Sequence, residues 1–108
     1  MYPHLGYKYK GQLVMDRVDL SKVEKQLKKV PQEIVFRLMR WIRTIEEFGL
    51  NEARKVKGYH DEPLKGLRQG QRSVRLGIKW RAIYTLSKTG ELNIVKVEEV
   101  TPHDYRTK

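Results

Sequence analysis

A long helical repeat of apolar residues, from Gln32 to Phe48, constrains this 108-residue chain more than any other feature. The apolar residues recur at intervals of three and four, at Ile34, Leu38, Trp41, Ile42, Ile45 and Phe48. This spacing places them on one side of an α-helix, which needs a second layer of structure to cover it. Pro31 suits the first position of that helix because its missing N–H is not needed there, and Gly49 suits the C-terminal cap.

The other side of the expected helix is basic. It carries Arg37, Arg40 and Arg43. Such residues commonly form a solvated face with ion pairs to nearby glutamates, and the alternative is a surface for a partner.

The residues before this helix are less regular. The segment "QLVMDRVDL", residues 12–20, is apolar and β-branched and suits a first strand. Ser21 and Glu24 have the spacing of a capping box, which predicts a short helix before Pro31. The opening segment shows no periodicity, so we expect residues 1–12 to be a flexible lead-in or an upstream extension, and residues 13–108 to be a single domain.

In the second half of the chain the apolar spacing changes to two. In "RSVRLGI", Val74, Leu76 and Ile78 would share one face of a strand. The segments "WRAIYTL" and "ELNIVKVEEV" predict two further strands, joined by "SKTG" as a hairpin turn with Gly90 at positive φ. Because the helices come first and the strands follow, the order of elements indicates an α+β fold.

The strand region is also strongly basic. No acidic residue occurs between Pro63 and Gly90, whereas the same stretch holds Lys65, Arg68, Arg72, Arg75, Lys79 and Arg81. Soluble surfaces usually mix both signs, so this stretch is a candidate anion-facing surface. The net charge of +10 favours nucleic acid, an anionic membrane or an acidic protein as the partner.

Several classes of site are excluded or disfavoured. The chain has no cysteine, which rules out disulfides, thiolate catalysis and cysteine-based metal sites. His4, His60 and His103 lie far apart without metal-binding spacing, so we expect no metal and no cofactor. The longest apolar runs are too short to cross a membrane and no signal pattern opens the chain, which makes the cytoplasm the default location.

The motifs of the second half occur in a recognisable order. The segment "PLKGLRQGQRSVRLGIKWRAIYTL" is followed by a strand and by a terminal "EVTPHDY". With the preceding strand and helices, this order resembles the RelE/ParE toxin superfamily, most closely its HigB-like mRNA interferases. The resemblance implies an N-terminal helical hairpin packed on a small twisted, mainly antiparallel sheet. It also implies a toxin of a type II toxin–antitoxin system that inhibits translation by cleaving mRNA in the ribosomal decoding site, with a cognate antitoxin, the ribosome and mRNA as partners.

The resemblance extends to particular residues. The family's catalytic set would fall on Arg75, Arg81, His103, Asp104 and Tyr105. Contacts to RNA or to the ribosome would fall on Lys65, Arg68, Arg72, Ser73, Lys79 and His60. Ser73 stands where RelE-type toxins carry a second basic residue on the first basic strand.

Metal-independent RNA cleavage would use these residues in two ways. When the ribose 2′-OH attacks the adjacent phosphorus, the charge on the phosphorane must be stabilised and protons must be transferred. Arg75 and Arg81 suit the first task because guanidinium is planar, charged and bidentate toward phosphate. His103, with an ordinary pKa of about 6.5, suits the second. Asp104 and Tyr105 are the other candidates, and each of the three could equally have a structural role.

Other readings stay open at this point. A ParE-like inhibitor of DNA gyrase would share the fold without nuclease activity, and a non-catalytic RNA-binding module would share the basic sheet. An acidic or amphipathic antitoxin segment is expected to cover the basic sheet or the helical surface. Trp80 and Tyr84 could stack on bases, but large aromatic residues in a strand flanked by apolar residues favour the core.

Overall fold

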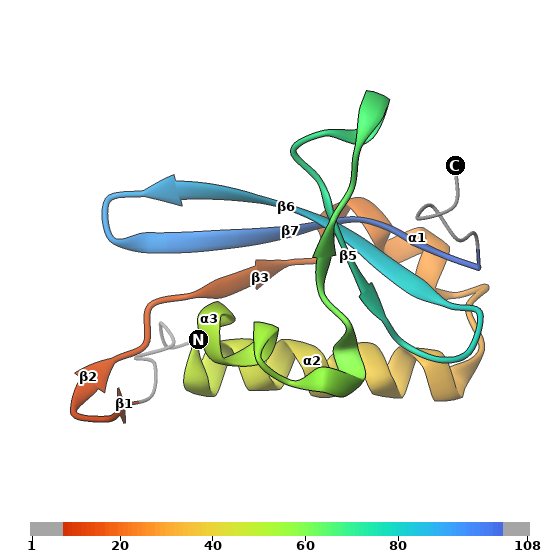
Figure 1. Ribbon diagram of the computed structural model, residues 1–108. Coiled ribbons are helices and arrows are strands. Elements are labelled where there is room, and N and C mark those ends of the chain that lie inside the picture. The colour runs from red at the N-terminus through yellow and green to blue at the C-terminus, as the bar shows by residue number, and fades with distance from the viewer. Residues whose placement is uncertain (1–7, 103–108) are drawn as a thin grey trace.

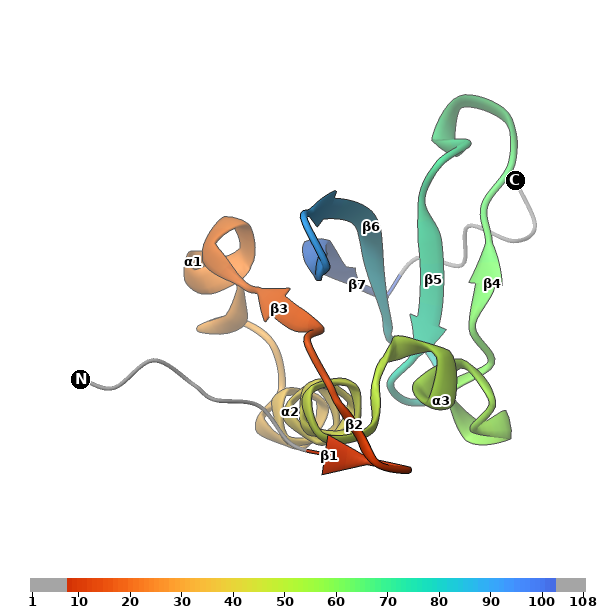
Figure 2. The same ribbon diagram turned by 90° about the vertical axis from the view of Figure 1, so that its left-hand side faces the viewer.

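Residues 8–102 of the chain are described by a computed structural model, in which one long helix lies along one face of a five-stranded sheet (Figure 1). The sheet order is β3–β7–β6–β5–β4, with β3 parallel to β7 and the other neighbours antiparallel. The strands are β3 (Arg17–Asp19), β4 (Glu62–Pro63), β5 (Arg72–Arg75), β6 (Arg81–Thr89) and β7 (Leu92–Thr101). The expected α+β class and the mainly antiparallel sheet are confirmed, and Figures 1 and 2 show that the sheet is strongly twisted.

Helix α2 spans Gln32–Phe48, as its apolar spacing predicts. It buries Ile34, Leu38, Trp41, Ile42 and Ile45 against the sheet, while Phe48 is 43% exposed. Pro31 precedes the helix as its N-cap, one position earlier than expected. Gly49 ends it with a φ of 95°, and its N–H donates to the Ile45 carbonyl at 2.7 Å. Within residues 8–102, no helix is long and apolar enough to cross a membrane.

The expected helical hairpin is not found, because α2 is flanked by single turns. Before it lie a 3₁₀ turn, η1 (Ser21–Val23), and the one-turn helix α1 (Glu24–Leu27). After it, α3 (Leu50–Arg54) forms the short helical tail. The predicted capping box is also wrong, since Ser21 makes no side-chain cap and its N–H instead donates to Asp19 Oδ1 at 2.9 Å. An Asp two residues before the turn satisfies the donor that the box would have used.

Part of the expected lead-in is structured. Strands β1 (Lys8–Tyr9) and β2 (Gln12–Leu13) form a small hairpin. Lys10 and Gly11 both have positive φ, 54° and 80°, as in the tight turns that match strand twist. The Tyr9 ring meets the Phe48 ring edge-on, with centroids 5.2 Å apart. The strand expected over residues 12–20 is therefore divided between β2 and β3.

The strands of the second half differ from the prediction in one place. β5 ends at Arg75, and residues 76–80 form a loop that is closed by the Leu76 N–H donating to the Trp80 carbonyl at 2.9 Å. Ile78, expected on the buried face, is consequently 96% exposed. The hairpin turn between β6 and β7 is confirmed, with Gly90 at a φ of 60° and Thr89 opposite Leu92. Tyr84 is fully buried, and Trp80 is partly buried and packs against the hydrophobic core.

Candidate nucleic-acid interface

Strand pairing brings Arg75 and Arg81 together. The two residues are directly opposite each other on β5 and β6, and Thr101 on β7 is opposite Arg81. The neighbouring row, Val74, Ala82 and Val100, belongs to the core beneath α2. Since successive residues of a strand point to opposite faces, the arginine row lies on the face turned away from α2.

The two arginines differ in their environment. Arg75 is exposed and has no ion pair among the residues that the structure describes, whereas Arg81 is only 3% exposed. Guanidinium is a planar cation that can donate two parallel hydrogen bonds to a phosphate. Arg75 can therefore contact an anion at the surface. The positive charge of Arg81 lies below the surface, on the neighbouring strand. This pair has the charge that a phosphate-binding surface requires.

Arg72, at the other end of β5, already has a partner. Its Nε donates to Asp61 Oδ1 at 2.6 Å, and the Tyr84 hydroxyl donates to Asp61 Oδ2 at 2.6 Å. The Asp61 side chain is 1% exposed. Burial, followed by the hydrogen bond to Asp61, raises the pKa of Tyr84 to about 12, while Arg54 acts in the opposite direction. Arg72 thus belongs to a hydrogen-bond network that joins Asp61, in the loop before β4, to strands β5 and β6.

Two more of the expected contact residues are also engaged in the fold. Arg68 donates to Gln71 Oε1 at 2.8 Å and lies 3.3 Å from Glu99 Oε1, which joins the β4–β5 connection to β7. Ser73 is fully buried between Glu62 and Ile83 in the sheet register. A ligand at the surface cannot touch Ser73 in this arrangement, which corrects its expected role.

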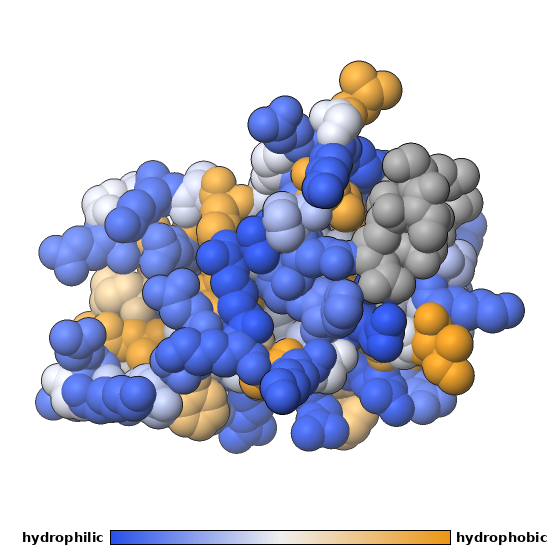
Figure 3. Space-filling view, viewed as in Figure 1, coloured by the Kyte–Doolittle hydropathy of each residue, from blue (hydrophilic) through white to orange (hydrophobic). Residues whose placement is uncertain are grey.

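The remaining expected contact residues lie in surface loops. Lys65 and Lys79 are exposed, in the β4–β5 and β5–β6 connections. His60 is exposed as well, with its Nε2 3.4 Å from Glu62 Oε1. The side of the molecule seen in Figure 3 is largely hydrophilic, with separate hydrophobic spots, one of them at the tip of the β4–β5 connection.

The expected proton-transfer residues, His103, Asp104 and Tyr105, lie outside the described residues. β7 ends at Thr101, opposite Arg81. In the part of the chain from residue 8 to residue 102, no three His, Asp or Glu side chains are grouped so that they could hold a metal ion.

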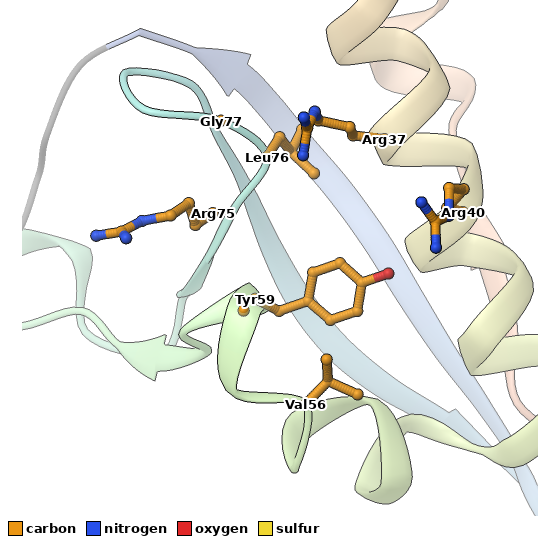
Figure 4. A pocket seen from close by; sticks show the side chains of 8 residues that line it. Arg37, Arg40, Val56, Tyr59, Arg75, Leu76 and Gly77 are labelled. Atoms are coloured by element: carbon orange, nitrogen blue, oxygen red, sulfur yellow. The ribbon is translucent and has the colours of Figure 1, made fainter.

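A second basic feature includes two of the α2 arginines for which a partner surface was the alternative expectation. A pocket of about 270 Å³ is lined by Arg37, Arg40, Val56, Gly58, Tyr59, Arg75, Leu76 and Gly77 (Figure 4). The spacing of the arginines on α2 was the only signal for it in the sequence, because the loop after α3 supplies Tyr59 and no local pattern predicts where that loop lies.

Comparison with known proteins gives matches among solved structures alone. No family model matches the chain, and no curated protein sequence matches it. A YoeB/ParE toxin from Agrobacterium tumefaciens superposes with a TM-score of 0.56 at 21% identity, over 82% of this chain and 98% of the toxin. YafQ from E. coli gives 0.56 at 19% identity, over 79% and 88% of the two chains.

The toxin–antitoxin complex RelBE2 from Mycobacterium tuberculosis also matches, with a TM-score of 0.56 at 19% identity, over 78% of this chain and 93% of the other. Each of these proteins is similar along most of its own length. The chain therefore has the fold of the RelE/ParE-like toxins, as the order of its motifs predicts.

Proposed function

We propose that this protein is the toxin of a type II toxin–antitoxin pair and that it inhibits translation by cutting mRNA in the decoding site of the ribosome. The observation that carries the proposal is the pairing of Arg75 with Arg81 on the sheet face turned away from α2. The toxin fold of the solved relatives supports it. Because a ribosome is the site of action, the protein would act in the cytoplasm.

The chemistry assigned to this face is metal-independent. The 2′-OH of a ribose attacks the adjacent phosphorus, the P–O5′ bond breaks, and the products are a cyclic phosphate and a free 5′-OH. Arg75 would contact a non-bridging phosphate oxygen, and Arg81 would stabilise the same developing negative charge from beneath. His103, Asp104 and Tyr105 are the candidates for removing the 2′-OH proton and protonating the leaving oxygen.

Binding would precede cleavage through the exposed loop cations. Lys65 and Lys79 stand in the two connections on either side of β5, so they would contact phosphates on both sides of the scissile bond. The net charge of +10 would steer the protein to the ribosome and to an acidic antitoxin. The RelBE2 relative was itself solved as a toxin–antitoxin complex, which supports the antitoxin as a partner.

The test is induction of the protein in growing cells, followed by primer extension on a reporter mRNA. The proposal expects cuts in register with the codons, and their loss when the start codon of the reporter is removed. An Arg75→Ala variant expressed at the same level is the matched control. Intact mRNA with accumulating double-strand DNA breaks would reject the proposal and select the gyrase inhibitor instead.

A further inference from the structure

A side chain of the one-turn helix α1 holds the C-terminal end of β7. The Gln26 Nε2 donates to the Val100 carbonyl, and the Val100 N–H donates to Gln26 Oε1 at 3.2 Å. Figure 1 shows α1 beside this end of β7, beyond the residues at which β3 pairs with β7. The Gln26 amide therefore takes the place of a neighbouring strand and satisfies both backbone groups of Val100.

A β-bulge in β7 comes just before this contact. Two residues of β7, Glu98 and Glu99, oppose a single residue of β6. The extra residue displaces the alternation of the strand, so that Val97 and Val100 both belong to the core beneath α2. Without it, Val100 would be the residue opposite Arg81. The bulge is thus the feature that places Thr101 in the arginine row.

The bulged residue is itself anchored by side chains from two elements. Lys22 Nζ, in η1, donates to Glu98 Oε1 at 2.6 Å, and Thr85 Oγ1, in β6, donates to Glu98 Oε2 at 2.7 Å. These hydrogen bonds, that of Lys22 first, lower the pKa of Glu98. Because the Lys22 side chain is 55% exposed, solvent screens its ion pair. The neutral amide of Gln26, which binds backbone at two atoms, is therefore the stronger restraint on this end of β7.

We propose that Gln26 is a positioning residue for the arginine row. By fixing Val100 it keeps Thr101 opposite Arg81, and it so holds Arg81 where it would stabilise the phosphate; this inference rests on the function proposed above. Thr101 and Arg81 are 4% and 3% exposed, so a shift of the strand end would displace both within a packed site. A group that stabilises a transition state must be held to within about 0.5 Å of its productive position.

The experiment compares binding with cleavage, because a side chain that only covered a strand edge would change stability and leave the rate of the folded protein unaltered. Single-turnover cleavage of mRNA on programmed ribosomes is measured with saturating protein, and affinity for ribosomes is measured separately. Gln26→Ala should lower the rate by roughly 10- to 100-fold without a change in affinity. Circular dichroism checks that each variant is folded.

Two further variants sharpen this comparison. Gln26→Glu keeps an acceptor for the Val100 N–H, but an ionised carboxylate has no proton to donate to the Val100 carbonyl, so its rate should lie between those of the parent and Gln26→Ala. Gln32→Ala is the matched control, because Gln32 is exposed at the start of α2 and makes no side-chain hydrogen bond within residues 8–102. It should cut at the parental rate.

Amide hydrogen exchange, followed by NMR on the free protein, tests the same contact without RNA. In Gln26→Ala the Val100 N–H should exchange at least about fivefold faster than in the parent, because it has lost its acceptor. The N–H groups of Arg81 and Thr101 should also exchange faster. Gln32→Ala should leave all three unchanged.

Several results would overturn the proposal. They are a folded Gln26→Ala protein that cuts at the parental rate, one that loses affinity for ribosomes and keeps its rate, an equal loss of rate in Gln32→Ala, or unchanged exchange at Val100, Thr101 and Arg81. If the parent itself does not cut mRNA, the proposed function fails. The exchange experiment then still decides whether Gln26 positions Arg81 and Thr101.

Discussion

The two ends of β5 carry the same residue type in opposite situations. At one end Arg72 is held by Asp61, whose other oxygen accepts the Tyr84 hydroxyl, and the carboxylate between them is 1% exposed. At the other end Arg75 is exposed, stands opposite Arg81, and has no ion pair within residues 8–102. One arginine stabilises the fold, and the other is available to an external anion.

The difference shows how a run of basic residues divides in three dimensions. The acids that engage this run come from outside it: Asp61 precedes the acid-free stretch and binds Arg72, and Glu99 follows it and binds Arg68. The acid-free stretch is therefore less cationic in space than it is in sequence. Its exposed cations without an ion pair in the described residues are Lys65, Arg75 and Lys79 in and beside β5, and Lys88 near the β6–β7 turn. The first three are the charges that a polyanion at β5 would meet.

Removal of Asp61 should produce the largest effect. Asp61→Ala leaves the Arg72 guanidinium and the Tyr84 hydroxyl without their acceptor in a buried site, so the free energy of unfolding should fall by about 3–5 kcal/mol. The measurement is urea unfolding followed by circular dichroism. Arg75→Ala is the control from the other end of the strand and should change stability by less than about 0.5 kcal/mol. Equal losses in the two variants would abolish the distinction between the two ends.

Much of the fold could be predicted because local patterns determine it. The spacing of apolar residues in α2 fixes both its length and its buried face, and the alternation in β6 and β7 fixes two long strands. Two local predictions were wrong, the capping box at Ser21 and the burial of Ile78. Asp19 accepts the Ser21 N–H and replaces the capping box. Ile78 continues the alternation of β5 in sequence, yet the chain turns before it.

The candidate site was less predictable than the fold, because its residues are sorted by partners far along the chain. Arg75 and Arg81 could be placed on consecutive strands in advance, but their direct opposition depends on the turn after Arg75, which the alternation of apolar residues did not predict. Nothing local shows that Arg72 meets Asp61, 11 positions away, or that Arg68 meets Glu99, 31 positions away. Burial of Ser73 likewise depends on strands and loops that only the tertiary structure brings together.

The second prediction compares the two arginines of the candidate catalytic face. Arg75→Ala should lower the single-turnover rate of mRNA cleavage on programmed ribosomes by roughly 30- to 1000-fold, equivalent to about 2–4 kcal/mol in the barrier. Arg75→Lys should rescue only part of this loss, because lysine lacks the bidentate geometry. Circular dichroism under the assay conditions checks that each variant is folded.

Arg81→Ala should cause a similar loss of rate and, unlike Arg75→Ala, should also reduce stability, because its side chain is buried. A folded Arg75→Ala protein that cuts at the parental rate would remove Arg75 from the catalytic set. It would also leave the exposed end of β5 with a binding role alone.

The smallest effect concerns the buried end of β5 and appears only in alkali. Burial raises the pKa of Tyr84 from 10.0 to about 12. Below about pH 10 the hydroxyl is protonated in both the folded and the unfolded chain, and its contribution is fully present. Between about pH 10 and pH 12 the unfolded chain loses this proton while the folded chain keeps it, so the free energy of unfolding falls as the pH rises, by on the order of 2 kcal/mol in total.

Tyr84→Phe lacks this proton and keeps the ring that packs against Trp41, with centroids 5.3 Å apart in the parent. At neutral pH the variant should be less stable by about 1 kcal/mol, because Asp61 loses one donor. On titration above about pH 10 the parent should lose stability more steeply than the variant, so the gap between them should close and then reverse. Urea unfolding at a series of alkaline pH values measures both slopes, and ionisation of the lysines and the other tyrosines is common to the two proteins. If the stability of the two proteins fell equally with pH, Tyr84 would ionise in the folded chain as it does in the unfolded chain. Its hydroxyl would then not be buried in the hydrogen bond to Asp61.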